Sequence, residues 1–358
     1  MLISAERMHQ VTRTPWVRSL ICATLLSALA SAPSAPAKDR KVDNKAQKAA
    51  AESLLAKSRG LSNIEEPGSP PFVLNAKVHY QIGAQKAEGQ AQIIWTAPDH
   101  YREAFTAPNY FYTEIVRDGY EYLARTNNEM PLLIYELQRA IQMAMRAGLT
   151  QKQKIKSVDK IAAKDQSLTC VTFSDKSLFK RCFSSDGDVS TMERNESPSG
   201  GVLAERYEFH DFVDLGAKRF PQDIVFRGGD NHTLEMNVEQ LASIKTVASD
   251  AFVIPTGAMK EAWCAEPKMG SPQFSGVPFS GAIDPGPAMD AVLALRTAKA
   301  SLYLEIMSNG RVRNVAVIQS AKPIKDTYLK ALVNNMRYPA RLCGNEGTEY
   351  QMEISLAP

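Results

Sequence analysis

The chain has 358 residues, of which 44% are hydrophobic and 23% are charged, with 42 Lys and Arg against 39 Asp and Glu. This composition is that of an ordinary globular protein, and it excludes collagen-like, coiled-coil and fully disordered chains. Residues 1–37 carry two of the three net positive charges, so the remainder has a net charge of only +1. We therefore expect no nucleic-acid partner, because no domain-wide basic field is left to bind one.

The N-terminus has the three parts of a secretory signal peptide. Residues 1–18 are net positive, residues 20–32 are small or apolar, and Ala35-Pro36-Ala37 provides a cleavage site before Lys38. The apolar run would span only about 20 Å as a helix, short of the roughly 30 Å hydrocarbon core of a bilayer. We therefore expect residues 1–37 to be removed and the mature protein to reside in the periplasm. If residues 20–32 are retained instead, the protein is anchored in the inner membrane.

Four cysteines lie beyond the signal peptide, at positions Cys170, Cys182, Cys264 and Cys343. A zinc site is the alternative to disulfides, but no C-x-x-C spacing is present and exported thiols normally oxidise. Residues 168–173 and 180–185 read as two short strands that bring Cys170 opposite Cys182. We therefore expect these two to pair, which leaves Cys264 to pair with Cys343.

Residues 38–71 predict a short amphipathic helix that ends near Gly60, followed by a Pro-rich linker. From Phe72 onward, apolar and polar residues alternate with the period of a strand that has one buried face. The domain at 72–260 is therefore expected to be α+β, with a curved antiparallel sheet and a covering helix at 132–147. Its strands are expected at 72–80, 89–97, 101–106, 111–117, 120–125, 167–173, 180–184, 189–194, 204–209, 223–227 and 232–240.

A second linker is predicted at 261–287, which contains five prolines among few bulky residues. Beyond it, a helix at 288–295 and a strand at 301–308 precede Asn309-Gly310, the usual sequence of a type I′ hairpin. A strand at 312–319, a helix after Pro323 and a last strand at 349–356 complete a small α+β domain over 288–358.

The usual signatures of catalysis and of metal or phosphate binding are missing, among them G-x-S-x-G, H-E-x-x-H and the Walker loop. We therefore expect no catalytic residues, no metal and no cofactor. A hydrolase built around His210 and Asp211 is a third, less favoured hypothesis, because these residues lie in a predicted strand whose polar edge faces solvent.

Aromatic side chains are concentrated in the first domain. Trp95, Phe105, Phe111 and Tyr122 are candidates to line an apolar cavity for a lipid beneath the sheet. The alternative is ordinary core packing with exposed pairs of tyrosines, and the composition favours that alternative.

The C-terminal segment, residues 285–358, resembles the TonB C-terminal domain family. The matching features are the Asn309-Gly310 turn, the helix that ends in Met336-Arg337-Tyr338-Pro339-Ala340, and the final strand after Gly347. The resemblance implies binding of an outer-membrane receptor, whose short segment adds as a strand to an exposed sheet edge. The edge strand would consist of Glu349, Tyr350, Gln351, Met352, Glu353, Ile354 and Ser355.

The region from Phe72 to Pro255 more weakly resembles the half-barrels of lipoprotein carriers and sorting proteins of the LolA/LolB type. The resemblance rests on Gly89 to Trp95 with the following Pro98, Tyr101 and Arg102, on Gly216 to Pro221, and on Phe252-Val253-Ile254-Pro255. It implies a carrier of lipid or lipoprotein.

Together these features are similar to those of exported two-domain proteins of Gram-negative bacteria. The leading hypothesis is a non-enzymatic periplasmic protein whose TonB-like module binds an outer-membrane receptor or another envelope protein by strand addition. It would then act in TonB-like energy transduction or in assembly. The alternative hypothesis is a periplasmic carrier that holds a lipid or lipoprotein in its half-barrel domain.

Overall fold

The computed structural model describes residues 44–145, 154–163, 166–174, 179–194, 204–228, 232–248, 250–265, 268–269, 300–320 and 325–356. The expected signal peptide at 1–37 and the expected helix at 288–295 lie outside these residues. Asp43–Pro358 form one compact unit. Among the described helices, none is long and apolar enough to cross a bilayer.

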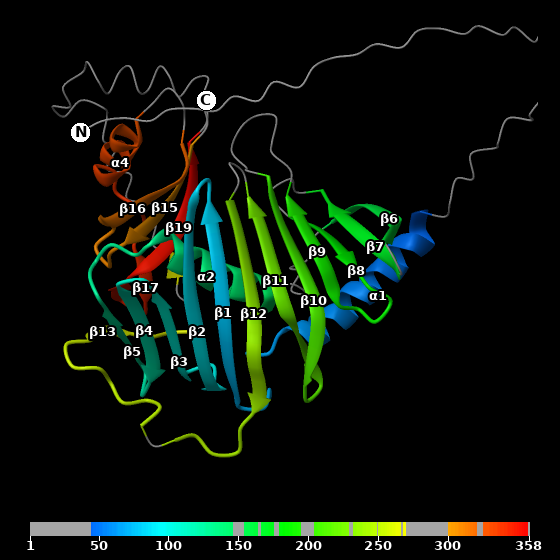
Figure 1. Ribbon diagram of the computed structural model, residues 1–358, viewed down its shortest axis with the longest axis horizontal. Helices are drawn as coiled ribbons and strands as arrows, with labels where there is room; N and C mark the ends of the chain where they lie inside the picture. Colours follow the sequence, from blue (N-terminus) through cyan, green and yellow to red (C-terminus); the bar gives the residue numbers. More distant parts are fainter. Residues whose placement is uncertain are drawn as a thin grey trace, which may run out of the picture. The chain divides into compact units, whose positions relative to one another are not determined.

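The main sheet has thirteen antiparallel strands in the order β13-β5-β4-β3-β2-β1-β12-β11-β10-β9-β8-β7-β6 (Figure 1). It is an open sheet, because β13 and β6 stand at its two ends, and the fold class is α+β. The strands are β1 (Phe72–Ile82), β2 (Gln85–Ala97), β3 (His100–Ala107), β4 (Tyr110–Arg117), β5 (Tyr120–Arg125), β6 (Ile155–Ala163), β7 (Gln166–Phe173), β8 (Lys180–Phe183), β9 (Val189–Arg194), β10 (Glu205–Leu215), β11 (Lys218–Gly228), β12 (His232–Ser243) and β13 (Met259–Ala262).

Local sequence explains most of these strands. In β1, every second residue from Phe72 to Tyr80 is buried, and the residues that alternate with them are more exposed. Tight turns join neighbouring strands, and Asp118 and Gly119 between β4 and β5 both have positive φ, 54° and 77°. Positive φ at both central residues is what a type I′ hairpin requires. The pairing of β1 with β12, by contrast, joins segments that are far apart in the chain.

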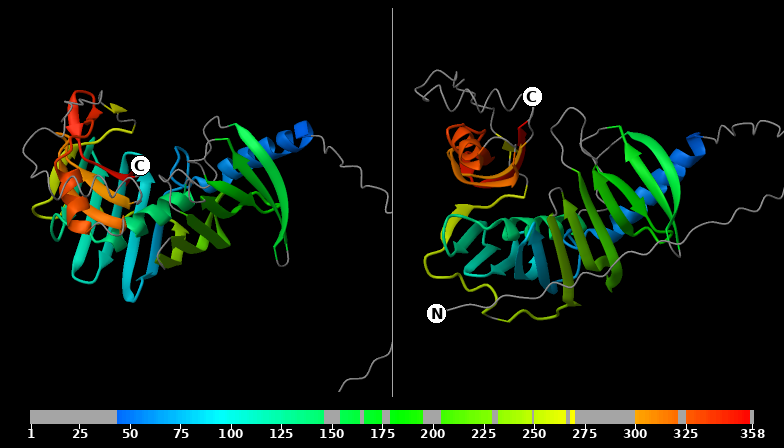
Figure 2. Two further views of the ribbon diagram at one scale, coloured as in Figure 1. Left: turned by 90° about the horizontal axis from the view of Figure 1, so that it is seen from above. Right: turned by 45° about the horizontal axis from the view of Figure 1, so that its top comes forward.

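Two helices, α1 (Asn44–Ser62) and α2 (Leu132–Met145), lie on the same face of the main sheet (Figure 2). Apolar residues of α2 such as Leu133 and Leu137 are buried, and so are the polar residues Glu136 and Gln138. The reason is that α2 is also covered on its other side, where the ring of Tyr135 packs on that of Tyr303 with centroids 4.0 Å apart. Tyr303 belongs to the C-terminal module.

The C-terminal module contains a three-stranded sheet in the order β16-β15-β19 and one described helix. Successive residues of β15 point to opposite faces. Leu302 and Leu304 pack against Leu329 and Val333 of the helix, whereas Tyr303 joins the core of the main sheet. The elements are β15 (Ala300–Ile306), β16 (Val312–Gln319), α4 (Asp326–Asn334) and β19 (Tyr350–Leu356), with a second small sheet of β14 (Lys268–Met269), β17 (Arg341–Cys343) and β18 (Glu346–Thr348).

The turn between β15 and β16 is not the expected type I′ hairpin. Of Asn309 and Gly310, only Gly310 has positive φ, at 75°. The N–H of Gly310 donates to the carbonyl of Met307 at 2.8 Å, and the N–H of Met307 donates to the carbonyl of Arg311 at 2.8 Å. This is the pattern of a three-residue loop that ends in a left-handed glycine. Asn309 contributes its side-chain oxygen, which accepts the N–H of Arg311 at 3.0 Å.

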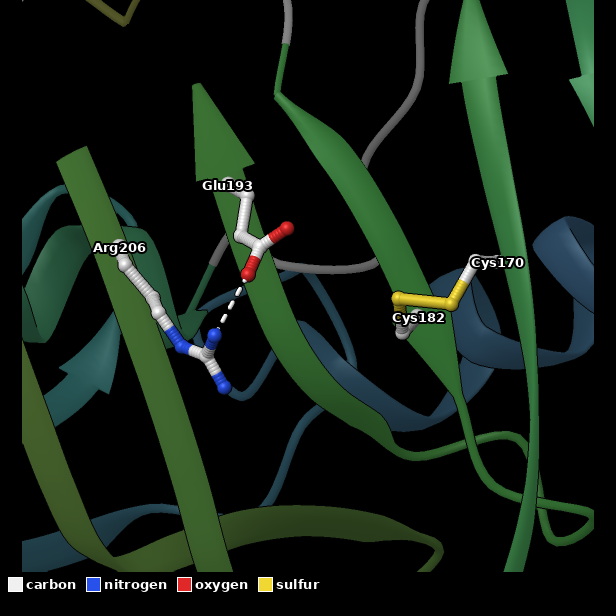
Figure 3. Close-up of a disulfide and its surroundings, with 4 residues drawn as sticks. All are labelled: Cys170, Cys182, Glu193 and Arg206. Atoms are coloured by element: carbon white, nitrogen blue, oxygen red, sulfur yellow. Dashed lines mark hydrogen bonds and ion pairs between the residues drawn. A yellow bond between two sulfur atoms is a disulfide. The ribbon is translucent and has the colours of Figure 1, made fainter. Parts of the chain in front are cut away.

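Two disulfides have the pairing expected from the sequence. Cys170 on β7 is joined to Cys182 on β8, directly opposite in the register, and the ion pair of Glu193 and Arg206 lies nearby on β9 and β10 (Figure 3). Cys264, which follows β13, is joined to Cys343 on β17. The second bridge therefore ties the edge of the main sheet to the C-terminal module.

Candidate functional site

A cavity of about 630 Å³ lies where the main sheet meets the C-terminal module. Its walls come from β3, β4, β5 and β13, from α2, and from the segment that includes β17 and the start of β19. The volume is within the range of small-molecule binding sites. Two arginines line it, Arg125 and Arg341, against seven glutamates: Glu65, Glu103, Glu114, Glu121, Glu261, Glu305 and Glu349.

Four of these glutamates form two directly opposed pairs on the sheet. The hairpin between β3 and β4 places Glu103 opposite Glu114, and the pairing of β5 with β13 places Glu121 opposite Glu261. Like charges directly opposite one another destabilise a sheet. These two pairs of glutamates are therefore unfavourable for the stability of the sheet. Unfavourable arrangements of this kind are expected mainly at functional sites.

Two tyrosine hydroxyls hold the Glu114 carboxylate. Tyr101 donates to its Oε1 and Tyr112 to its Oε2, each at 2.8 Å. Burial, reinforced by the charge of Glu114, raises the pKa of both tyrosines well above the usual range. Both phenols are therefore neutral donors at physiological pH, and they orient Glu114 at the cavity wall.

Glu121 has the most strongly perturbed pKa among the cavity glutamates. Burial, followed by the charges of Glu114 and Glu261, raises it to about 8, and Arg341 acts in the opposite direction. Burial also raises the pKa of Glu261, whose Oε2 accepts the backbone N–H of Glu349 at 2.9 Å. The Glu121 carboxyl is therefore harder to ionise than that of a solvent-exposed glutamate.

Two further glutamates already have arginine partners. Glu305 is paired with Arg125, with 3.0 Å between Oε2 and Nη1, and Glu349 is paired with Arg313. On the helix side of the cavity, Gln138 is 6% exposed, and its Oε1 has no hydrogen-bond donor among the described residues. Nε and Nη2 of Arg125 are likewise buried and have no acceptor among the described residues.

Carboxyl groups and aromatic side chains make up much of the cavity wall. The described lining contains no histidine, serine or lysine, and its one cysteine, Cys264, is in a disulfide. In the part of the chain that the structure describes, no group of three or more His, Cys, Asp or Glu is placed to hold a metal ion. Carboxylates and aromatic faces such as those of Trp95 and Tyr101 suit a ligand that is rich in hydrogen-bond donors or positively charged.

The four candidates for an apolar site, Trp95, Phe105, Phe111 and Tyr122, lie on two different faces of the sheet. Trp95 and Phe105 are buried on the helix-covered face, and the ring of Trp95 stacks on Phe72 with centroids 5.7 Å apart. Phe111 is 44% exposed and, like Tyr122, alternates with residues that line the cavity, so both point to the opposite face. The period of two within β4 and β5 separates these residues.

The expected edge strand corresponds to β19, which stands at one end of its sheet with β15 as its strand neighbour. Glu349, Tyr350 and Gln351 line the cavity. Glu353 instead faces α2, where its Oε2 lies 3.3 Å from Nη1 of Arg139, and its Oε1 accepts the hydroxyl of Ser301 on β15 at 2.7 Å. Of the remaining residues of the segment, Met352 and Ile354 pack in the module's own core.

Four residues that carry the TonB resemblance, Asn309, Gly310, Tyr338 and Pro339, lie close together in the C-terminal module. The N–H of Tyr338 donates to the carbonyl of Gly310 at 2.9 Å, and the hydroxyl of Tyr350 donates to the carbonyl of Pro339 at 2.8 Å. They connect the hairpin that contains Asn309 to the start of β19. Their role in the described structure is therefore to hold the module together.

His210 lies on β10, with its side chain 49% exposed and 3.6 Å from Glu208. Asp211, the next residue, has a positive φ of 52°, and the register of β10 with β11 continues without a shift from the pair His210 and Asp223 to the pair Phe212 and Pro221. No serine is bonded to His210 among the described residues, so the geometry does not assemble a catalytic triad there.

Sequence reasoning missed the glutamates of the cavity. One signal was available, because a two-residue turn at Pro108-Asn109 pairs Glu103 with Glu114 once both strands are assigned. The partner of Glu121 comes from β13, a strand of only four residues that follows a long loop. No local sequence pattern indicates that Glu121 is paired with Glu261.

No known protein family matches the sequence, and no curated protein matches it either. Among solved structures, a LolA superfamily protein from Nitrosomonas europaea matches 57% of this chain and 97% of its own, with 11% identity and a TM-score of 0.34. An outer membrane lipoprotein-sorting protein domain from Vibrio parahaemolyticus matches 56% of this chain and 94% of its own, with 9% identity and a TM-score of 0.36.

A DUF1329 family protein from Desulfovibrio piger matches 59% of this chain and 97% of its own, with 7% identity and a TM-score of 0.35. None of these three matches concerns TonB. The TonB resemblance of residues 285–358 therefore stays a prediction.

Proposed function

We propose that this chain is an exported, non-enzymatic carrier-type binding protein whose ligand occupies the cavity between β3–β5 and the C-terminal module. The observation that carries the proposal is the cavity itself, whose 630 Å³ is open to a ligand and lined by groups from both parts of the chain. A ligand held there contacts the main sheet and the module together. Its binding is therefore linked to how the module is held.

The lining also bears on the nature of the ligand. An acyl chain in this cavity would remove water from charged and polar groups of the wall, such as Glu261 and Arg341, which is unfavourable. A polar ligand with hydrogen-bond donors avoids that cost. The proposal therefore keeps the carrier hypothesis but moves the site from the apolar core of the half-barrel to the polar cavity.

The test is native mass spectrometry of the full chain, produced with its own signal sequence and isolated without denaturation. Leu123 lines the cavity, so Leu123→Trp fills it, whereas Val253→Trp places the same bulk on a side chain that is 62% exposed outside it. We expect a bound species in the wild-type protein and in Val253→Trp, and its loss in Leu123→Trp. Identical spectra for all three proteins would contradict the proposal, and extraction of a lipid would restore the apolar-ligand hypothesis.

A second candidate function is strand addition by an envelope partner at β19. The observation that favours it is the position of β19 at the end of its sheet, beside the cavity. Extended peptides from the N-termini of outer-membrane receptors would bind the full chain, and Gln351→Pro would block them while Gln351→Ala would not, because proline removes a backbone donor. Equal binding by both variants would remove this candidate.

A further inference from the structure

We propose that the disulfide between Cys264 and Cys343 is a redox-controlled tether, whose reduction by a dithiol frees β13 and opens one wall of the cavity. The bridge holds at the edge of the main sheet a short strand that its own pairing retains only weakly. This inference adds a form of regulation to the cavity, and its consequence for a ligand rests on the proposed function. The release of β13 itself depends on no ligand.

The two disulfides of the chain differ in how well a reductant can reach them. Cys170 is fully buried and Cys182 is 4% exposed, and both pack with Leu168 in a small apolar cluster. Cys264 and Cys343 are both partly exposed, and Cys264 lines the cavity. Thiol–disulfide exchange requires that a thiolate reach one sulfur atom of the bridge. A small dithiol should therefore reduce the bridge of Cys264 and Cys343 first.

The pairing of β13 with the main sheet is weak. The strand has four residues and stands at the end of the sheet, with β5 as its strand neighbour. Glu261 of β13 lies directly opposite Glu121 of β5, and like charges in that position destabilise a sheet. Burial raises the pKa of both carboxyls, that of Glu121 to about 8. Separation of the two strands returns both groups to water, so the pair favours separation.

Three contacts of β13 and of the residue after it oppose this separation. They are the cation–π contact of Lys260 with Tyr120, the hydrogen bond from the N–H of Glu349 to Glu261, and that from the N–H of Trp263 to the carbonyl of Gly119. Cys264 follows immediately, and its bridge to Cys343 spans a sequence separation of 79. A bridge across a loop of this length strongly restricts how far β13 can move from β17.

The rest of the C-terminal module has attachments of its own to the main sheet and α2. Glu305 on β15 is paired with Arg125 at 3.0 Å, and the ring of Tyr303 packs on that of Tyr135 with centroids 4.0 Å apart. These contacts involve β15 rather than β17, so they do not depend on the bridge. Reduction should therefore release β13 together with β17 and β18, while β15 and β16 stay in place.

The chemical step is thiol–disulfide exchange with a dithiol as the reductant. One thiolate of the dithiol attacks a sulfur atom of the bridge, forms a mixed disulfide and displaces the other cysteine as a thiolate. The second thiol of the reductant then displaces the remaining cysteine and closes the reductant's own disulfide. Two electrons pass to the bridge, and the two protons of the dithiol end on Cys264 and Cys343.

The experiment is a titration of the full chain with dithiothreitol. Alkylation by N-ethylmaleimide and peptide mass spectrometry show which cysteines are free, and hydrogen–deuterium exchange then reports on each strand. Cys264→Ser/Cys343→Ser lacks the tether without any reductant. Cys170→Ser/Cys182→Ser removes the other bridge and is the matched control. Adding Glu261→Gln to the variant without the tether removes one of the two opposed carboxyls and keeps an acceptor oxygen. Partial reduction of the wild type tests the same step where a variant fails to fold.

We expect the bridge of Cys264 and Cys343 to be reduced at a dithiothreitol concentration roughly tenfold lower than the other bridge requires. Exchange in β13 and β17 should then rise roughly tenfold, in the reduced wild type and in Cys264→Ser/Cys343→Ser, with β15 and β16 unchanged. Glu261→Gln should restore part of the protection of β13. Reduction of both bridges together, unchanged exchange in β13, loss of protection across β15 and β16, or no recovery with Glu261→Gln would overturn the inference.

The two proposals fail separately. If selective reduction leaves β13 protected, the tether is not a switch, whereas loss of the ligand in Leu123→Trp still identifies the cavity as the site. If Leu123→Trp retains the ligand, the carrier proposal fails, and the exchange of β13 still tests the tether. Where both hold, the native mass spectrum of Cys264→Ser/Cys343→Ser should show less of the bound species than that of the wild type.

Discussion

Arg125 on β5 donates from Nη1 to Oε2 of Glu305 on β15 at 3.0 Å, and this ion pair joins the main sheet to the C-terminal module. The two side chains are only 6% and 7% exposed. Burial raises the pKa of Glu305, and the charge of Arg125 opposes that rise. The junction at the cavity therefore depends on a charged pair that is shielded from water.

We expect Arg125→Met to lower the free energy of unfolding by about 3 kcal/mol, because it leaves the Glu305 carboxyl buried without its partner. The double variant Arg125→Met/Glu305→Leu should recover most of this loss, since neither charge then remains. Urea unfolding at pH 7 of the wild type, both single variants and the double variant gives the coupling energy. A double variant as unstable as the sum of the single variants would show that the pair contributes nothing as a pair.

His232 gives the chain a predictable response to acid. The residue is 3% exposed, lies edge-on to Tyr80 with ring centroids 5.0 Å apart, and its Nε2 has no partner among the described residues. Burial, with a smaller effect of Arg139, lowers the pKa of His232 to about 4. Between pH 6.5 and 4 the unfolded chain therefore takes up a proton that the folded chain refuses, so stability falls as the pH falls.

Over that window His232 should account for roughly 3 kcal/mol of the loss in unfolding free energy. His232→Leu should lack this part of the pH dependence, whereas His79→Gln, at a side chain 65% exposed, should retain it. Denaturant titrations at pH 7 and pH 4.5 measure the difference. If both variants follow the wild type, His232 is protonated in the folded protein and the assignment is wrong.

The strands that were predictable are those fixed by neighbours in the chain. The alternation from Phe72 and the Asp118-Gly119 turn specify β1, β4 and β5, because side-chain period and turn type act over a few residues. The sheet order was not predictable, because β12 returns beside β1 and β13 beside β5 through long-range pairing. The same distinction applies to the residues of the cavity. Glu103 and Glu114 lie in one hairpin and could be paired from the sequence, whereas Glu121 and Glu261 are brought together only by long-range pairing.

The aromatic residues show a second limit. Trp95 and Phe111 belong to the same aromatic-rich region, but the pleat and register place them on opposite faces of the sheet. Composition counts side chains without assigning them to a face. Predicting a ligand site from composition therefore merged a core residue with an exposed one.

The disulfides and the signal peptide together predict one mass measurement. A mature chain that begins near Lys38 lacks Cys22, and its four cysteines form two bridges. Full reduction should therefore add four hydrogens, about 4 Da, and no free thiol should react with a maleimide before it. A heavier, membrane-associated species that keeps residues 1–37, or a reactive thiol in the native protein, would contradict this expectation.

Gly310 is the position in the C-terminal module where a single methyl group should matter most. Its φ of 75° is strained for any residue with a side chain, and a Cβ built there would lie 2.3 Å from the carbonyl oxygen of Tyr338. The backbone N–H of Tyr338 donates a hydrogen bond to the carbonyl of Gly310. Tyr338 therefore cannot move away from an added Cβ without breaking this hydrogen bond. Gly310→Ala combines the cost of the left-handed conformation with that of a steric clash.

We expect Gly310→Ala to destabilise the module by at least 2 kcal/mol, roughly the sum of about 1 kcal/mol for the backbone conformation and a similar or larger cost for displacing Tyr338. Gly83 is the matched control, because it also has a positive φ, 55°, but a Cβ there meets no atom within 4 Å. Gly83→Ala should therefore cost only the conformational part. Hydrogen exchange of β15 and β16 in Gly310→Ala, and of β1 and β2 in Gly83→Ala, separates the two contributions. An equal loss of protection in the two hairpins would show that the approach of Tyr338 is not a constraint.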